Sequence, residues 1–249
     1  MDVREKAWSV LMEGLRHHRA AHRTVAVQSL SLMPRVRRAS QLALSALDDK
    51  DFHVRTAAAM SLGQLHASGS IPALHKALDD PEMSVVLAAT QALYLLKDKA
   101  AFDVYYAILM KDRKSSNSLV QAQLDRLKDP KQMMQLGFQE GIGFVPFGSM
   151  GYEAFREITR GGGPSVRAAA ARLLATDPDQ ISEDALVQAA VADGNEEVRL
   201  ASLDALAQRG NPRVVERLAK NLDEDKAAVR YRTAAVILHL SSLERRKKK

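Results

Sequence analysis

Small and apolar residues recur along this chain at helical spacing. In the stretch 54–65 they stand at positions 54, 58, 62 and 65, and in 85–96 at positions 85, 89, 93 and 96. Offsets of 0, 4, 8 and 11 place such residues in one stripe along one face of an α-helix. Aromatic residues make up only 5% of the chain, and alanine and leucine supply most of the apolar content. The pattern therefore predicts closely packed amphipathic helices instead of strands.

The stripe repeats at intervals of 31 or 32 residues. Each copy opens with a valine followed by arginine or valine, and an earlier copy begins at Arg23, 32 residues before Arg55. The opening pairs are Val54-Arg55, Val85-Val86, Val166-Arg167, Val198-Arg199 and Val229-Arg230. Between Leu96 and Val166 the period is lost, and the segments 100–111 and 118–127 form only a degenerate fourth pair. Self-similarity at a fixed period of this length is typical of repeat architectures. We interpret the copies as the inner helices of an array.

Shorter apolar-periodic segments lie between the copies and predict the outer helices. They cover 36–47, 71–78, 185–192 and 214–222, and Pro72 and Pro212 stand near the first turn, where proline is tolerated. A pair of short helices cannot bury its apolar face alone, so neighbouring pairs must stack. We expect one array over residues 1–242, about seven antiparallel helix pairs long, and a basic tail over 243–249.

An acidic residue precedes most of the valines and completes a recognisable pattern. Asp-x4-Val-Arg-x2-Ala-x3-Leu-Gly-x-Leu, at 49–65, resembles the short HEAT repeat of bilin-lyase-like proteins, and the acid recurs as Asp80, Asp193 and Glu224, with Gly161 in the fifth copy. The resemblance implies an all-α fold, a right-handed α-α superhelix (HEAT-like solenoid). It also implies that the acid lies in a turn, caps the next helix and meets the arginine of a neighbouring repeat.

The repeated arginines are therefore interpreted as a ladder of ion pairs and not as a phosphate-binding track. They are Arg23, Arg55, Arg167, Arg199 and Arg230. The net charge of +6 agrees, because five of these charges form the terminal run 245–249. Such a run is typically a solvated, disordered end.

A glycine-rich segment with three phenylalanines, 137–151, interrupts the repeat. It lacks a dinucleotide fingerprint and a Walker lysine. Two interpretations stay open for Phe144 and Phe147. They plug the joint between two halves of the array, or they form a mobile lip that contributes to a partner site.

No catalytic residue, metal ligand or cofactor is predicted. Deoxyhypusine hydroxylase resembles this chain in its HEAT-like pairs, but none of the seven histidines here is followed by glutamate, as its di-iron site requires. His18 and His22 stand four apart, with His17 nearby, and could form a metal pair on one helical face. Without a carboxylate close in sequence, a solvated helix start is the favoured interpretation. The absence of cysteine excludes disulfides and thiolate sites.

The chain start has no apolar leader, so a cytoplasmic location is the default, with export possible if a leader was removed. The longest uncharged stretch, 56–75, is broken by Gly63, Gly69 and Pro72, so no membrane association is expected. A monomer is expected.

The stripe opposite the core positions supplies candidates for partner binding on the concave surface. Projected by the repeat shift, they are Met60, Leu87, Gln91, Tyr94, Arg172, Leu200, Asp204, Tyr231 and Leu238, with Phe144 and Phe147 added from the insertion. This mixture of apolar and aromatic residues suits a protein or peptide better than a phosphate backbone. We therefore predict a protein–protein interaction scaffold without catalysis, whose partner is a protein or peptide and not nucleic acid.

The alternative is a nucleic-acid-binding protein related to DNA alkylation-repair glycosylases, which resemble this chain through HEAT-like repeats. Such a protein needs clustered cations with aromatics around a displaced nucleotide. The single tryptophan, Trp8, stands at the chain terminus. Bilin lyase activity is supported by repeat similarity alone, which is weak ground for a function.

Overall fold

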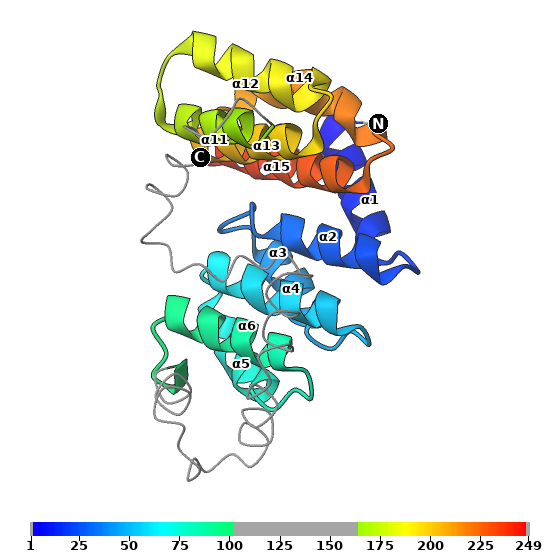
Figure 1. Ribbon diagram of the computed structural model, residues 1–249, viewed down its shortest axis with the longest axis vertical. Helices are drawn as coiled ribbons and strands as arrows, with labels where there is room; N and C mark the ends of the chain where they lie inside the picture. Colours follow the sequence, from blue (N-terminus) through cyan, green and yellow to red (C-terminus); the bar gives the residue numbers. More distant parts are fainter. Residues whose placement is uncertain (1, 102–163, 248–249) are drawn as a thin grey trace. The chain divides into compact units, whose positions relative to one another are not determined.

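The computed structural model describes residues 2–101 and 164–247, and every regular element in these two ranges is a helix (Figure 1). The chain forms two compact units. One unit combines residues 1–36 with 146–249, and we call it the terminal unit; the other, 37–145, is the middle unit. The described residues of each unit are built from stacked helix pairs, as the repeat predicts.

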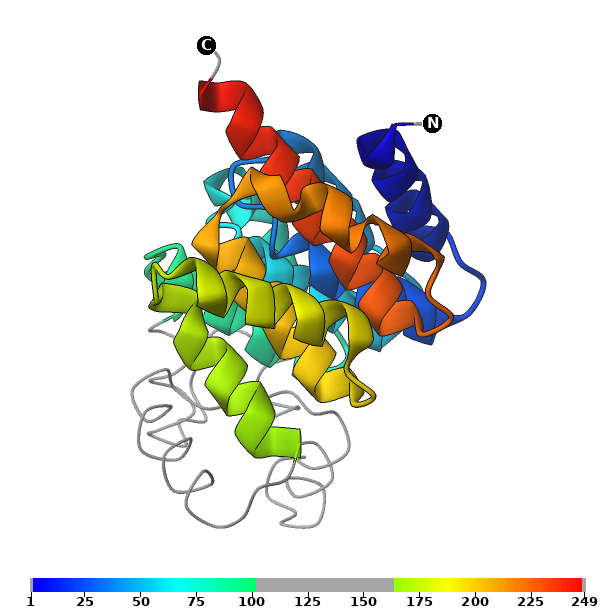
Figure 2. The same cartoon turned by 90° about the horizontal axis from the view of Figure 1, so that it is seen from above.

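The terminal unit has two layers of helices. Figure 2, seen from above, shows α12 and α14 lying over α13 and α15. The elements are α1 (Val3–Leu15), α2 (Ala20–Leu30), α11 (Pro164–Leu173), η2 (Leu174–Thr176), α12 (Gln180–Ala192), α13 (Glu196–Arg209), η3 (Pro212–Val214), α14 (Val215–Leu218), η4 (Ala219–Asp223) and α15 (Ala227–Lys247). The predicted outer helix at 214–222 is thus a short helix with a 3-10 turn on each side.

The two ends of the chain meet within the terminal unit. Helix α11 packs on α13, α13 on α15, and α15 in turn on both α1 and α2 (Figure 1). The N-terminal pair therefore takes the place of the repeat that would follow the last one. Stacking order in space consequently differs from order along the chain, which the repeat pattern alone does not indicate.

In its described residues, 37–101, the middle unit has two inner helices, each with an outer helix. Its elements are α3 (Arg37–Ala46), α4 (Phe52–Gln64), η1 (Ser68–Ser70), α5 (Ile71–Ala77) and α6 (Met83–Leu95). Helix α4 packs closely on α6, since a Cβ added to Gly63 would lie 2.8 Å from Cα of Ala92. The lack of a side chain at Gly63 therefore allows the two backbones to approach.

The predicted core positions are buried in most copies. Val54, Ala58 and Leu62 of α4 are at most 1% exposed, and Val85, Ala89 and Leu93 of α6 are fully buried. The fifth copy is an exception: Ala170, at the same position as Ala58, is exposed, whereas Ala168, Ala169 and Ala171 are buried. The burial expected at Ala170 is therefore not found.

Several predictions lie outside the described residues. Phe144, Phe147 and the segment 137–151 belong to the range 102–163, so both interpretations of the insertion stay open. A single array over 1–242 and the number of helix pairs also remain predictions. Among the described helices, none combines the length and apolarity needed to cross a bilayer.

Candidate functional site

The repeated arginines bind the acids of the repeats that follow them. Arg55 forms a two-pronged pair with Asp80, with Nε 2.7 Å from Oδ2 and Nη2 2.8 Å from Oδ1. Arg199 Nη2 lies 2.6 Å from Oε2 of Glu224, and Arg167 pairs with Asp193. The predicted contact between each acid and a neighbouring arginine is confirmed in these three pairs. These arginines therefore hold neighbouring repeats together.

Each partner of the Arg55 pair also stabilises a turn. Nη1 of Arg55 donates to the carbonyl oxygens of Asp49 and Lys50 at 3.0 and 3.2 Å. Oδ1 of Asp80 accepts the backbone N–H of Glu82 at 2.9 Å, at the start of α6. The hydrogen bond that Arg55 donates to the Asp80 carboxylate, together with the charge of that carboxylate, raises the pKa of Arg55 above its ordinary value against the opposing effect of burial.

The ladder continues from the last repeat to the first helix. Nη2 of Arg230 lies 3.6 Å from Oε1 of Glu13, and Lys6 Nζ lies 2.5 Å from Oδ2 of Asp223. Glu13 and Lys6 belong to α1, so the N-terminal helix contributes charged groups as a following repeat does. These pairs agree with the position of α1 beside α15.

Equivalent residues of the inner helices form rows along the surface of the array. We number each row by how many residues it follows the repeat valine, so that Thr56, two residues after Val54, lies in row two. Rows two and nine face the next inner helix. In α4, Thr56 lies in row two and its Oγ1 donates to Ser84 Oγ at 3.3 Å, while Gly63, in row nine, abuts Ala92. In α15 the same rows hold Tyr231 and Leu238, which are 0% and 2% exposed. The prediction that Tyr231 and Leu238 face a partner is wrong, because α1 and α2 pack against α15.

Leu87 and Tyr94 occupy the same two rows of α6. Tyr94 is 51% exposed and Leu87 is half-buried. Their counterparts in α4 are Thr56 and Gly63, so Leu87 and Tyr94 lie where the next repeat would pack, and residues 102–163 are outside the described residues. Leu200, in row two of α13, is likewise half-buried. All three stay predictions as partner-binding residues.

Row six stays accessible in the described inner helices other than α15, and we call it the open row. Met60 and Gln91 are half-buried and Arg172 is exposed. Asp204 is half-buried and binds Arg232 through two hydrogen bonds of 2.6 and 2.7 Å. The sequence analysis missed Gln28 of α2, an exposed member of the same row. Counting the repeat shift back from Met60 to the copy at Arg23 was the signal that could have found it.

Row ten lies one helical turn after the open row on the same face of each inner helix. It contains Gln64 of α4 and Gln208 of α13, both exposed, and the half-buried Leu95 of α6. In place of the predicted apolar and aromatic character, these two rows combine amides and a methionine with Leu95 and the charged Arg172 and Asp204. Uncharged amides and thioethers supply adaptable contacts to a peptide without attracting phosphate.

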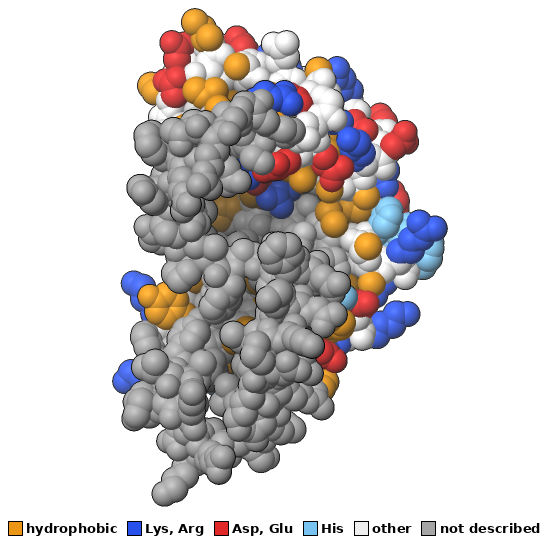
Figure 3. Space-filling view, in the orientation of Figure 1, with side chains coloured by type: hydrophobic (Ala, Val, Ile, Leu, Met, Phe, Trp, Pro, Cys, Tyr) orange, Lys and Arg blue, Asp and Glu red, His pale blue; other side chains and the backbone are white. Residues whose placement is uncertain are grey.

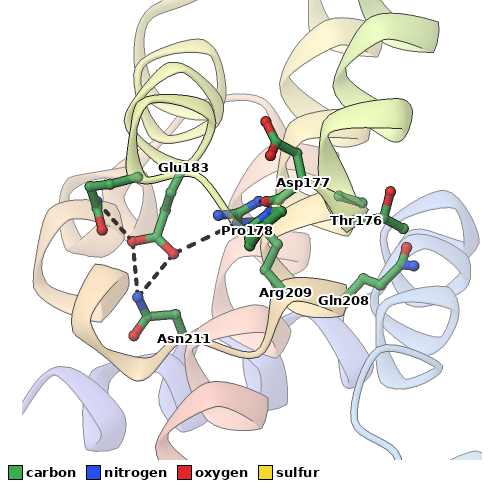
Figure 4. Close-up of a pocket in the computed structure, with 9 residues that line it drawn as sticks. Thr176, Asp177, Pro178, Glu183, Gln208, Arg209 and Asn211 are labelled. Atoms are coloured by element: carbon green, nitrogen blue, oxygen red, sulfur yellow. Dashed lines mark hydrogen bonds and ion pairs between the residues drawn. The ribbon is translucent and has the colours of Figure 1, made fainter.

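A polar pocket of about 550 Å³ lies where α12 begins and α13 ends (Figure 4). Glu183 and Arg209 point toward one another there, with Arg209 Nε 3.7 Å from Glu183 Oε2 and side chains only 5% and 8% exposed. Nδ2 of Asn211 donates to both carboxylate oxygens of Glu183 at 2.9 Å. The carboxylate is therefore held from two sides.

Arg209 uses its remaining donors on the turn between α11 and α12. Its Nη1 donates to the carbonyl oxygens of Leu174, at 3.0 Å, and Asp177, and its Nη2 to that of Asp179 at 2.9 Å. These bonds fix the turn on the end of α13. The ionic groups of this pocket consequently act as a clamp between repeats, which is a structural role.

The predicted histidine group is present as a stack of rings. The His17 ring centroid lies 3.9 Å from that of His22 and 4.4 Å from that of His18. Histidine side chains lie beside cationic ones at the right edge of Figure 3, over the α1–α2 turn. Within the described part of the chain, no group of three or more histidine or acidic side chains is arranged to hold a metal ion.

Comparison with known proteins identifies the repeat. The family of HEAT repeats matches residues 8–94, 40–124 and 152–238. Comparison with curated proteins gives no match. Among solved structures, the chain is similar to one in the complex of CpcE and CpcF of phycocyanin lyase from Nostoc sp. PCC7120, at 17% identity, with 93% of this chain and 94% of that chain covered and a TM-score of 0.37.

A second similar structure is an engineered protein, at 18% identity, with 98% of both chains covered and a TM-score of 0.28. The family match covers most of the sequence, and the described residues are helical throughout their regular elements. The expected all-α, HEAT-type helical solenoid is confirmed. The chain belongs to the family of HEAT-repeat proteins.

Proposed function

We propose that this protein is a non-catalytic scaffold that binds a partner protein or peptide along the open row of its inner helices. The observation that carries the proposal is that row six stays at least partly accessible in α2, α4, α6, α11 and α13, whereas rows two and nine are buried between helices in α4 and α15. Within each unit, a surface kept accessible from one repeat to the next suits an extended partner, since each repeat adds one similar contact.

The chemistry of this row favours a peptide over a phosphate backbone. Gln28, Met60 and Gln91 carry no charge, Asp204 is bound to Arg232, and Arg172 is the single cation among the described members of this row. Phosphate contacts require cations that are available to the ligand. The ladder arginines Arg55 and Arg199 are instead paired with acids of the next repeat. A protein partner therefore fits the open row better than nucleic acid.

The experiment uses the purified chain as bait in an extract of its host. Three forms are compared: the unchanged chain, a variant with Met60→Lys and Gln91→Lys, and a control with Gln41→Lys on the outer helix α3, where Gln41 is exposed. Lysine at these accessible positions keeps its ammonium group in water, so the fold is expected to survive. Circular dichroism and the melting temperature verify this.

The proposal predicts a captured protein that the double variant loses and the Gln41→Lys control retains. Equal capture by the double variant would place the binding surface elsewhere. Capture that disappears after nuclease treatment would favour the nucleic-acid alternative and overturn the proposal.

A further inference from the structure

The three stacked histidines lie where the N-terminal pair packs on the last helix. His17 and His18 belong to the turn between α1 and α2, and His22 to the first turn of α2. Nδ1 of His22 lies 3.0 Å from the hydroxyl oxygen of Tyr231, which is fully buried in α15. The stack therefore touches the contact that joins the two ends of the chain.

The hydrogen bond of His17 requires a neutral ring, and the surroundings of His22 favour one. Nδ1 of His17 accepts the backbone N–H of Arg19 at 3.2 Å, so this nitrogen carries no proton. Nη2 of Arg230 donates to the Tyr231 hydroxyl oxygen at 3.3 Å. The arrangement that gives every proton an acceptor has the Tyr231 hydroxyl donating to an unprotonated Nδ1 of His22. Protonation would remove both acceptors and leave a buried hydroxyl without one.

The charges around the stack are mainly positive. Arg19 and Arg23 come from the turn and α2, and Arg230 from α15 lies with its guanidinium carbon 5.1 Å from the Tyr231 ring centroid. Glu13 of α1 is the opposing acid, and it is shared with Arg230 at 3.6 Å. Desolvation lowers the pKa of His17, and the neighbouring His22 and His18 lower it further against the effect of Glu13. A second positive charge on a ring 3.9 Å away is strongly disfavoured.

We propose that the histidine stack is a proton-sensitive latch, which holds the N-terminal helix pair on α15 when His17 and His22 are neutral and releases it when they are protonated. The region has little room to adapt. A Cβ on Gly14 would lie 2.7 Å from Tyr231 Cζ and 2.9 Å from Cβ of Ala26, so the ring is tightly enclosed by α1 and α2. Loss of the His22 hydrogen bond is therefore expected to weaken the packing of α1 and α2 on α15.

The single tryptophan, Trp8, lies in α1 and reports whether this helix is docked. Its fluorescence is measured on the full chain while the pH is lowered from about 7.5 to about 5, a range that histidine titrates and that stays above the carboxylate range. The unchanged protein is expected to show a reversible change over this interval. A variant with His17→Gln and His22→Gln keeps an amide near each acceptor position and is expected to lose the change.

His66→Asn in the middle unit is the matched control, because His66 is exposed and asparagine tolerates its φ of +50°. This control should keep the midpoint of the unchanged protein. The single variant His17→Gln alters only the turn, and it should shift the midpoint of the fluorescence change to lower pH. It replaces the double variant as the test if the double variant is unfolded at pH 7.5. An unchanged midpoint in the histidine variants, or a flat titration of the original protein, would overturn the latch.

Discussion

The ring of Tyr231 lies against Gly14, so that a Cβ on this glycine would stand 2.7 Å from Tyr231 Cζ. The two residues are 217 positions apart in a repeat protein whose contacts are expected to run between neighbouring repeats. Through this contact the first helix pair completes the packing of the last helix. The terminal unit therefore depends on both ends of the chain.

Gly14→Ala should destabilise the protein although alanine is the better helix former by about 1 kcal/mol. The added methyl group meets a buried ring and Ala26, and overpacking of this kind typically costs about 1–3 kcal/mol. We expect the melting temperature to fall by several degrees. Gly69→Ala is the control, since a Cβ there meets nothing within 4 Å. A melting temperature that rises in Gly14→Ala would contradict the packing described.

Arg55 and Asp80 should show a strong coupling in a double-mutant cycle. Their side chains are only 14% and 11% exposed, and each also holds a turn. We expect Arg55→Ala and Asp80→Ala to be less than additive in unfolding by denaturant, with a coupling on the order of 1–3 kcal/mol. Arg55→Lys should recover little stability because lysine cannot form both bonds. Strict additivity of the two alanine variants would show that the pair does not hold α4 to α6.

Stability should fall on acidification as Glu224 loses its charge. The hydrogen bond from Arg199 lowers the pKa of Glu224 below its ordinary value of 4.5. A carboxyl whose folded-state pKa is depressed stabilises the fold above its unfolded pKa and loses this contribution as pH falls through the folded pKa. Glu224→Gln should therefore be less stable near neutral pH and should flatten the acid limb of the stability curve below about pH 4.5.

Chemical denaturation at a series of pH values measures this. Asp225→Asn is the control, because Asp225 is an exposed acid in the same turn. An acid limb that is equally steep in Glu224→Gln and in the unchanged protein would exclude Arg199–Glu224 as a source of the pH dependence.

Much of the fold was predictable because the repeat has a strict period. Val54, Ala58 and Leu62 are buried as their spacing indicates, and Arg55 meets Asp80 because the same turn recurs 31 residues later. Helical periodicity records which face of a helix is buried and which residues share a turn. The sequence was accordingly a good guide to the contacts between consecutive repeats.

The candidate site was harder to predict, because periodicity does not say what packs on the second side of a helix. Tyr231 and Leu238 carry the pattern of an accessible row, yet both are buried under α1 and α2. That burial results from a contact between the chain ends, which no local pattern encodes. Gln28 was missed because the projection by the repeat shift, which gave Gln91, was not carried back to the copy at Arg23.

The proposed scaffold function requires that a partner lies along the open row. The most direct test is amide hydrogen exchange of the chain with and without its captured partner, since protection reports local opening and coverage. We predict slower exchange at the open-row turns around Met60 and Gln91, with no change in the outer helices α3 and α5. Protection confined to α3 and α5, with α4 and α6 unaffected, would contradict the account.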